Sequence, residues 1–287
     1  MVTTKTPEGP TPDLHGRAQK LGLWGLLANW EKVGSKPWIE ELIHYEEEER
    51  GRRSLERRLR SSKVGRFKAI TDFDWKWPRQ IDRELVDELF SLEFIGEAAN
   101  AILVGPNGVG KTMIAKNLAY QAILRGHTAR FLTASELLND LAAQESSGAL
   151  MRRLRHYSQP EVLVIDEVGY LASSSEHTDL LFEVITRRYQ EKSIVLTTNK
   201  PFREWSSVFP NSTCVVTLID RLIHKAEVVE VEGKSYRLKE AQERAKERKE
   251  RRRRKKTPGR VGRAPRATNK REKPSTQPEA KTNTKNP

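Results

Sequence analysis

An α/β fold, with a parallel sheet between helices, is predicted for residues 81–240, and three observations predict it. Short apolar runs alternate with helical patterns along this part of the chain, as in strand–helix–strand units. The first apolar run ends in a glycine-rich loop that leads straight into a helical pattern. A later run ends in two adjacent carboxylates, and folds of this kind bind ligands at the carboxyl ends of their strands.

Five strands are expected in this sheet, each from a short apolar run: 101–104, 130–132, 162–165, 194–198 and 228–231. Between them, residues 112–124 and 180–189 have the composition and spacing of helices. Thr133 and Glu136 have the spacing of a capping box, so a further helix is expected to begin there. We therefore predict a five-stranded parallel sheet.

A small helical domain is predicted before the sheet, over residues 17–80. Its first part has apolar residues at helical spacing, namely Leu21, Leu23, Trp24, Leu26, Leu27 and Trp30. Residues 1–16 are rich in Pro, Gly and Thr and are expected to be a disordered end. Residues 71–78 are aromatic and acidic and close with a proline, which is typical of a connection.

The segment 50–68 of this domain holds nine basic residues and a single acid, Glu56. Two interpretations are open. The segment could be a solvated helix whose arginines pair with residues 46–49 at i,i+4 spacing. It could instead contact the phosphate backbone of a nucleic acid, and we favour this second interpretation.

Charge is distributed unevenly along the 287 residues. The net charge is +13, and residues 241–287 carry all of the surplus, with 18 Lys and Arg against 5 Asp and Glu. Residues 241–256 favour a helix but offer no apolar face for docking. Residues 257–287 have too little to bury and are expected to be disordered. A neutral body with a basic tail predicts a polyanionic partner.

Composition also excludes several classes of protein. The longest stretch without a charged residue, 205–219, contains Pro, Asn, Ser and Thr, so no membrane-spanning helix is expected. The single cysteine, Cys214, excludes a disulfide framework. The first residues lack the apolar segment of a secretory signal. We expect a cytoplasmic protein without membrane association.

The most specific motif follows the first expected strand and has the pattern G-x-x-x-x-G-K-[ST]. It comprises Gly105, Pro106, Asn107, Gly108, Val109, Gly110, Lys111 and Thr112. A strand before it and a helix after it are the context that a phosphate-binding loop requires. The glycines let backbone N–H groups face phosphate oxygens, and the helix start adds its positive dipole end. We expect Lys111 between the β- and γ-phosphates and Thr112 on Mg²⁺.

Two carboxylates follow the strand expected at 162–165. Asp166 is predicted to hold Mg²⁺, and Glu167 is predicted to orient and polarise an attacking water. The alternative is a strand that ends in two solvated acids, but the phosphate loop earlier in the chain favours catalysis. A glutamate that activates water indicates a hydrolase rather than a kinase of small molecules.

Asn199 and an arginine complete the candidate site. Asn199 would face the γ-phosphate if the strand at 194–198 lies between the first strand and the acidic one; otherwise it is a turn residue. A hydrolase of this kind gains from a guanidinium that a neighbouring subunit supplies. The candidates are Arg221, Arg187 and Arg188, and we favour Arg221.

Taken in chain order, these motifs and their flanking residues point to a known family. The strings, after the phosphate loop, are Val164-Ile165-Asp166-Glu167-Val168-Gly169-Tyr170, Thr197-Thr198-Asn199-Lys200-Pro201-Phe202-Arg203-Glu204-Trp205, Asp220-Arg221-Leu222-Ile223-His224 and Gly233-Lys234-Ser235-Tyr236-Arg237-Leu238. The chain resembles the IstB-like transposition helper ATPases, which are AAA+ proteins related to the DnaC helicase loaders. The resemblance runs from about Leu21 to Leu238 and leaves the basic tail outside.

The resemblance implies an AAA+ ATPase domain over residues 81–240, with ATP and Mg²⁺ as cofactors. By motif, Lys111 and Thr112 correspond to the family's nucleotide and Mg²⁺ ligands, and Asp166 and Glu167 to its metal-binding and catalytic acids. Asn199 corresponds to its γ-phosphate sensor and Arg221 to its trans-acting arginine. Two departures are visible. The acidic pair is Asp-Glu where an Asp-rich variant is common, which favours hydrolysis. The phosphate loop has Asn107 and Val109 where the family often has Pro or Thr.

The favoured function is that of an ATP-dependent DNA-binding helper of transposition. In this hypothesis, ATP bound between subunits builds a ring or spiral of this chain on duplex DNA, and the assembly recruits or activates a transposase before hydrolysis. A DnaC-like replicative helicase loader is the first alternative. The second is a nucleotide-gated DNA-binding scaffold without significant turnover.

Overall fold

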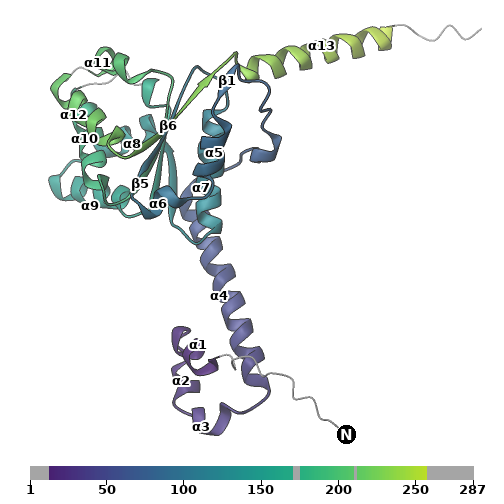
Figure 1. Cartoon of the computed structure of the whole chain (residues 1–287), viewed down its shortest axis with the longest axis vertical. Helices are drawn as coiled ribbons and strands as arrows, with labels where there is room; N and C mark the ends of the chain where they lie inside the picture. Colours follow the sequence, from purple (N-terminus) through teal and green to yellow (C-terminus); the bar gives the residue numbers. More distant parts are fainter. Residues whose placement is uncertain (1–12, 171–174, 210–211, 257–287) are drawn as a thin grey trace, which may run out of the picture. The chain divides into compact units, whose positions relative to one another are not determined.

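The structure is a computed structural model that describes residues 13–170, 175–209 and 212–256 (Figure 1). Disorder is predicted for residues 1–16 and 257–287. Residues 1–12 and 257–287 fall outside the described range, whereas Asp13 caps a helix that begins at Leu14, so the prediction is wrong for residues 13–16. The chain divides into two units, Met1–Ala241 and Gln242–Pro287. In the second unit the described residues continue helix α13 (Tyr236–Lys256), so the basic stretch 241–256 is helical, as its composition predicts.

The first unit begins with four helices: α1 (Leu14–Lys20), α2 (Trp24–Leu27), α3 (Trp30–Val33) and α4 (Trp38–Ser62). Ala18, Ile39 and Ile43 are fully buried where α1 meets α4. Most apolar residues predicted from helical spacing pack around them, whereas Trp24 is exposed. Helix α4 ends where Lys63 takes a left-handed backbone conformation, with φ 58°.

Six strands form one sheet in the order β1-β6-β2-β5-β4-β3. Five of them are the predicted strands, all paired in parallel: β2 (Asn100–Val104), β3 (Ala129–Thr133), β4 (Val162–Asp166), β5 (Ser193–Thr198) and β6 (Ala226–Glu232). The prediction of a purely parallel, five-stranded sheet is corrected by β1 (Gln80–Ile81), which pairs antiparallel with β6. A strand of two residues has no detectable periodicity, and it forms because the edge of β6 is available.

Helices cover both faces of the sheet (Figure 1). Helices α5 (Arg83–Leu89) and α7 (Lys111–Leu124) pack on one face, and the other face carries α8 (Ala134–Ala142), α9 (Ser147–Ser158), α10 (Ser175–Arg188) and α12 (Ser212–Ile223). The strands divide their side chains between two apolar cores by alternation. In β2, Ala101 and Leu103 belong to the core with α7, and Ile102 and Val104 belong to the other.

The predicted helices are confirmed with small changes of extent. Helix α7 matches the prediction for 112–124, and α10 begins earlier than the predicted 180–189. Thr133 and Glu136 form the predicted capping box at the start of α8. Shorter elements are α6 (Glu93–Gly96), α11 (Trp205–Val208), η1 (Ile70–Asp72), η2 (Val168–Tyr170) and η3 (Phe202–Glu204). No helix within the described ranges is long and apolar enough to cross a membrane.

The order of the strands positions the candidate site. Because β5 lies between β2 and β4, the carboxyl ends of these three strands are adjacent. The phosphate loop follows β2, Asp166 ends β4 and Asn199 follows β5. The strand before Asn199 thus lies between the first strand and the acidic one, which is the arrangement in which Asn199 is predicted to face the γ-phosphate.

Candidate functional site

The loop between β2 and α7 turns tightly at two glycines. Gly108 and Gly110 have positive backbone φ angles of 79° and 108°, a region that glycine adopts most readily. A Cβ atom at Gly110 would lie 2.4 Å from the Phe73 ring, and one at Gly108 would lie 2.2 Å from the Ser235 hydroxyl oxygen. The loop is thus packed between two other segments of the chain.

Lys111 begins α7 and is buried, with 8% of its surface exposed. Its Nζ donates hydrogen bonds to the carbonyl oxygens of Gly105, at 2.6 Å, and Pro106, at 2.8 Å. Burial lowers the pKa of Lys111 to about 8, and the nearby Asp166 carboxylate opposes that shift. Phosphate oxygens would be stronger acceptors for this buried ammonium than the two neutral carbonyls.

The two predicted magnesium ligands lie together. Thr112 Oγ1 donates a hydrogen bond to Asp166 Oδ1 at 3.0 Å, and Asp166 is 3% exposed. Across the described ranges, no group of three or more His, Cys, Asp and Glu side chains could hold a metal ion. Magnesium usually takes one or two protein ligands beside water and substrate phosphates. Thr112 and Asp166 fit such an ion if a phosphate supplies further oxygens.

Thr197 of β5 contacts both Asp166, which ends β4, and Glu167, which follows it. Its hydroxyl donates to Asp166 Oδ1 at 2.5 Å and accepts from the backbone N–H of Glu167 at 2.9 Å. Glu167 has a φ of 63°, a region that residues other than glycine seldom occupy. The chain therefore turns sharply at the predicted catalytic glutamate, whose side chain borders the same cavity as Asp166.

Asn199 lines this cavity at the end of β5. Its Oδ1 is buried and, among the residues that the structure describes, finds no hydrogen-bond partner. Gly169 leaves room for it, because a Cβ there would lie 2.0 Å from that oxygen. A buried acceptor without a donor is costly. A bound water or ligand that donates to Asn199 would remove this cost.

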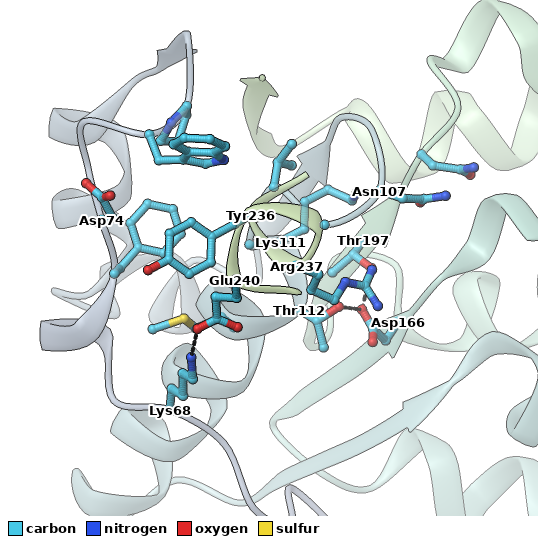
Figure 2. A pocket seen from close by; sticks show the side chains of 18 of the residues that line it. Lys68, Asp74, Asn107, Lys111, Thr112, Asp166, Thr197, Tyr236, Arg237 and Glu240 are labelled. Carbon is cyan, nitrogen blue, oxygen red and sulfur yellow. Dashed lines mark hydrogen bonds and ion pairs between the residues drawn. The ribbon is translucent and has the colours of Figure 1, made fainter. Parts of the chain in front are cut away.

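One cavity of about 380 Å³ is lined by loop residues 107–110 together with Lys111, Thr112, Asp166, Glu167, Thr197 and Asn199 (Figure 2). Gly105 and Pro106, which the motif also contains, are not part of this lining. The phosphate loop, the two acids and Asn199 form one side. The other side is formed by two segments that we call the cap, residues 68–78 and 236–240. The cap residues in the lining are Lys68, Asp72, Phe73, Asp74, Trp77, Pro78, Tyr236, Arg237 and Glu240.

Contacts between side chains hold the cap together. The Trp77 and Tyr236 rings meet edge to face at 5.9 Å. Lys239 lies over the Trp77 ring at 4.3 Å and pairs with Asp74 at 3.3 Å. The backbone N–H of Tyr236 donates to the carbonyl oxygen of Gly108 at 2.8 Å, which ties the cap to the phosphate loop. Sequence reasoning assigned the cap no role, although residues 233–238 were among the motifs.

Arg237 is a functional candidate that the sequence motifs contained but did not single out. Figure 2 shows its guanidinium beside Thr112 and Asp166. Its positive charge further lowers the pKa of Lys111. Two cations, Lys111 and Arg237, thus face the same space, an arrangement that suits a polyanionic ligand.

Arg188 is removed as a candidate for a trans-acting arginine. Its side chain is fully buried, and its guanidinium donates to the backbone carbonyls of Tyr157, Pro160, Glu161 and Ser193. Burial lowers its pKa to about 9. Because these bonds hold the guanidinium inside the unit, it cannot reach a nucleotide on another subunit.

Arg221 and Arg187 lie outside the cavity. Arg187 pairs with Glu183 at 3.2 Å. Arg221 lies 4.8 Å from the centre of the Phe182 ring and donates to the Thr186 hydroxyl. An arginine that acts on another subunit must lie away from its own cavity, as Arg221 does, and its role there stays a prediction.

Relatives of this chain are named as ATP-binding proteins of insertion sequences. The IstB-like ATP binding protein family matches residues 13–244. An ATP-binding protein of insertion sequence IS5376 from Geobacillus stearothermophilus is 34% identical over 220 residues, covering 76% of this chain and 88% of that protein. An ATP-binding protein of IS21 from Pseudomonas aeruginosa is 37% identical over 191 residues, covering 67% and 72%. Among solved structures, DnaI is 18% identical with a TM-score of 0.47, covering 59% of this chain and 93% of that chain.

Proposed function

Because the chain belongs to the family of IstB-like ATP-binding proteins, which have a P-loop AAA+ fold, we propose that it is an ATP-dependent, DNA-binding helper of transposition. It binds ATP and Mg²⁺ between subunits, assembles on duplex DNA, recruits or activates a transposase and hydrolyses ATP. The observation that carries the proposal is the single cavity in which the phosphate loop, Asp166, Glu167 and Asn199 meet.

The residues of the cavity divide the chemistry between them. Lys111 and the loop hold the β- and γ-phosphates, and Thr112 and Asp166 hold Mg²⁺, which when bound withdraws charge from the phosphate oxygens. Glu167 polarises the attacking water and takes up its proton. The unpaired Oδ1 of Asn199 accepts a hydrogen bond from that water and orients it.

The decisive test is Glu167→Gln, which keeps the size of the side chain but removes the base. We expect kcat for ATP hydrolysis to fall at least about 100-fold, while ATP affinity stays within about twofold because Glu167 is not a phosphate ligand. Phosphate release and titration with a fluorescent ATP analogue measure the two quantities. An unchanged rate would remove Glu167 from the mechanism. A wild-type chain without turnover, with or without DNA, would favour the scaffold alternative.

The basic segment 50–68 divides into two parts that differ in their partners. In the first part, each arginine pairs with a glutamate on α4: Arg50 with Glu46, Arg52 with Glu49 and Glu56, and Arg53 with Glu49. In the second part, four exposed cations have no acidic partner within the described ranges: Arg57, Arg60, Lys63 and Arg66. The solvated-helix interpretation therefore fits the first part, and we assign the phosphate contact to the second.

Two triple variants with the same change of charge test this assignment. One replaces Arg57, Arg60 and Lys63 by Gln, and its matched control replaces Arg50, Arg52 and Arg53 by Gln. Loss of three phosphate contacts should weaken duplex binding about tenfold or more and lower the salt slope by about 3. Fluorescence anisotropy across a salt series measures both. Equal losses of DNA affinity in the two variants would show that duplex binding depends on net charge and not on the position of the basic residues.

The partner protein separates the favoured function from the first alternative. The curated relatives are named as proteins of insertion sequences, which favours a transposase over a replicative helicase. Capture of each candidate by the Glu167→Gln variant, loaded with ATP on duplex DNA, tests the choice. Binding of the helicase and not the transposase would support a loader.

A further inference from the structure

We propose that Thr197 is a positioning residue that sets the geometry of both acidic residues in the hydrolytic site. The proposal rests on the ATPase function proposed above. Thr197 lies on β5, whereas Asp166 ends β4 and Glu167 follows it. Thr197 belongs to neither the phosphate loop nor the acidic pair. One hydroxyl group connects it to both acids.

The first connection fixes the carboxylate of Asp166. Thr197 Oγ1 donates to Asp166 Oδ1 at 2.5 Å, and Thr112 Oγ1 donates to the same oxygen at 3.0 Å. Hydroxyls from β5 and from α7 therefore converge on one oxygen. With two donors on Oδ1, rotation of the carboxylate is restricted, and the side chain that would hold Mg²⁺ is oriented before the ion binds.

The second connection fixes the backbone of Glu167. The parallel ladder between β4 and β5 pairs Ile165 with Leu196. Beyond the end of this ladder, the N–H of Glu167 donates to the Thr197 hydroxyl at 2.9 Å instead of to a main-chain oxygen. Glu167 has a φ of 63°, a conformation that persists only when its surroundings hold it. Without the hydroxyl, this N–H would lose its acceptor, and the turn that directs Glu167 would be free to relax.

Packing alone does not account for a hydroxyl at this position. Thr197 is 1% exposed and follows Ile194, Val195 and Leu196, which are all buried. Valine has the shape of threonine and would fill the same space in this strand. The hydroxyl is therefore explained by its hydrogen bonds to Asp166 and Glu167. Replacing threonine by valine removes these bonds while keeping the volume of the side chain.

The experiment compares Thr197→Val with Thr197→Ser in the full chain. For Thr197→Val we expect kcat to fall about 10–100-fold, as for other residues that orient a metal ligand. ATP affinity measured in EDTA should stay within about twofold, because no phosphate contact is lost. The Mg²⁺ concentration for half-maximal binding of a fluorescent ADP should rise about tenfold. Thr197→Ser keeps the hydroxyl and should restore all three quantities to within about threefold of the wild type.

Ser193→Ala is the matched control. Ser193 is a buried residue at the opposite end of β5, and its hydroxyl donates to the Phe94 carbonyl at 3.2 Å, away from the cavity. This variant should lower the thermal midpoint without changing kcat or the Mg²⁺ dependence. If Thr197→Val does not fold, Thr197→Ala replaces it with the same expected result.

Two results would overturn the proposal. One is a Thr197→Val variant whose kcat and Mg²⁺ dependence stay within about twofold of the wild type. The other is a Ser variant that fails to rescue, which would reduce Thr197 to a packing residue. A wild-type chain without ATP turnover would contradict the proposed function instead. In that case the Mg²⁺ titration with ADP would still test whether Thr197 orients the Asp166 carboxylate.

Discussion

The two sides of the cavity differ in how the chain builds them. The phosphate side comes from the ends of β2, β4 and β5, and each of its parts is a short contiguous motif. The cap comes from residues 68–78 and 236–240, and contacts such as Trp77 with Tyr236 and Lys239 with Asp74 join them. The reactive groups therefore follow the edge of the sheet, whereas the enclosure of the cavity depends on side-chain contacts between segments far apart in the chain.

The largest effect is expected on the phosphate side, from Lys111→Ala. If Lys111 holds the phosphates as proposed, this variant loses its charge-assisted contacts to them, so ATP affinity should fall more than about 100-fold. Titration with a fluorescent ATP analogue measures the loss. Lys116→Ala is the control, because Lys116 is on the same helix but lies over the Phe131 ring at 4.6 Å, outside the cavity lining. Retained affinity in Lys111→Ala would remove the loop as the phosphate site.

The next effect comes from Arg237→Ala, which tests whether the cap also takes part in phosphate binding. If Arg237 faces the terminal phosphate, ATP affinity should fall about 10–100-fold while ADP affinity falls less than about threefold. Competition titrations with the two nucleotides give this ratio. Equal losses of ATP and ADP affinity would instead show that Arg237 only helps to enclose the nucleotide and does not contact its terminal phosphate.

A smaller effect is expected from Trp77→Ala, which opens the aromatic part of the cap. We expect about 5–20-fold weaker binding of both ATP and ADP, because a stacked or enclosed base loses an aromatic neighbour. The kcat at saturating ATP should not change, since Trp77 contacts neither Asp166 nor Glu167. Trp38→Ala, which removes an exposed tryptophan of α4, is the control. A lower kcat at saturation would show that the two sides of the cavity are coupled.

The smallest effect concerns pH and the buried Lys111 ammonium. Because its pKa is lowered to about 8 in the free protein, Lys111 is neutral for part of the time above that pH. Bound phosphates favour the charged form, so binding should take up a proton, and ATP affinity should fall by at most about tenfold per pH unit above pH 8. Calorimetry in two buffers of different ionisation enthalpy measures this uptake. Proton release at pH 9 would contradict it.

Much of the candidate site could be predicted from the sequence because its chemistry is local. The site has three parts: the phosphate loop, the acidic pair at the end of β4 and the residues after β5. Within each part, the functional residues are only a few positions apart in the sequence. The condition placed on Asn199 was topological, and the observed strand order meets it. Arg188 shows the limit, because its position gave no sign that four backbone carbonyls would hold it inside the unit.

Local patterns in the sequence correctly predicted the α/β class and the five parallel strands, and they led to the proposal of which residues hold phosphate and metal. They could do so because periodicity and glycine-rich turns are encoded by neighbouring residues. The folded structure was needed to show that Thr197 bonds both acids, that β1 joins β6, and that Trp77 and Tyr236 meet within the cap, on one side of the cavity. These contacts join residues far apart in the chain, and their geometry exists only once the sheet has brought them together.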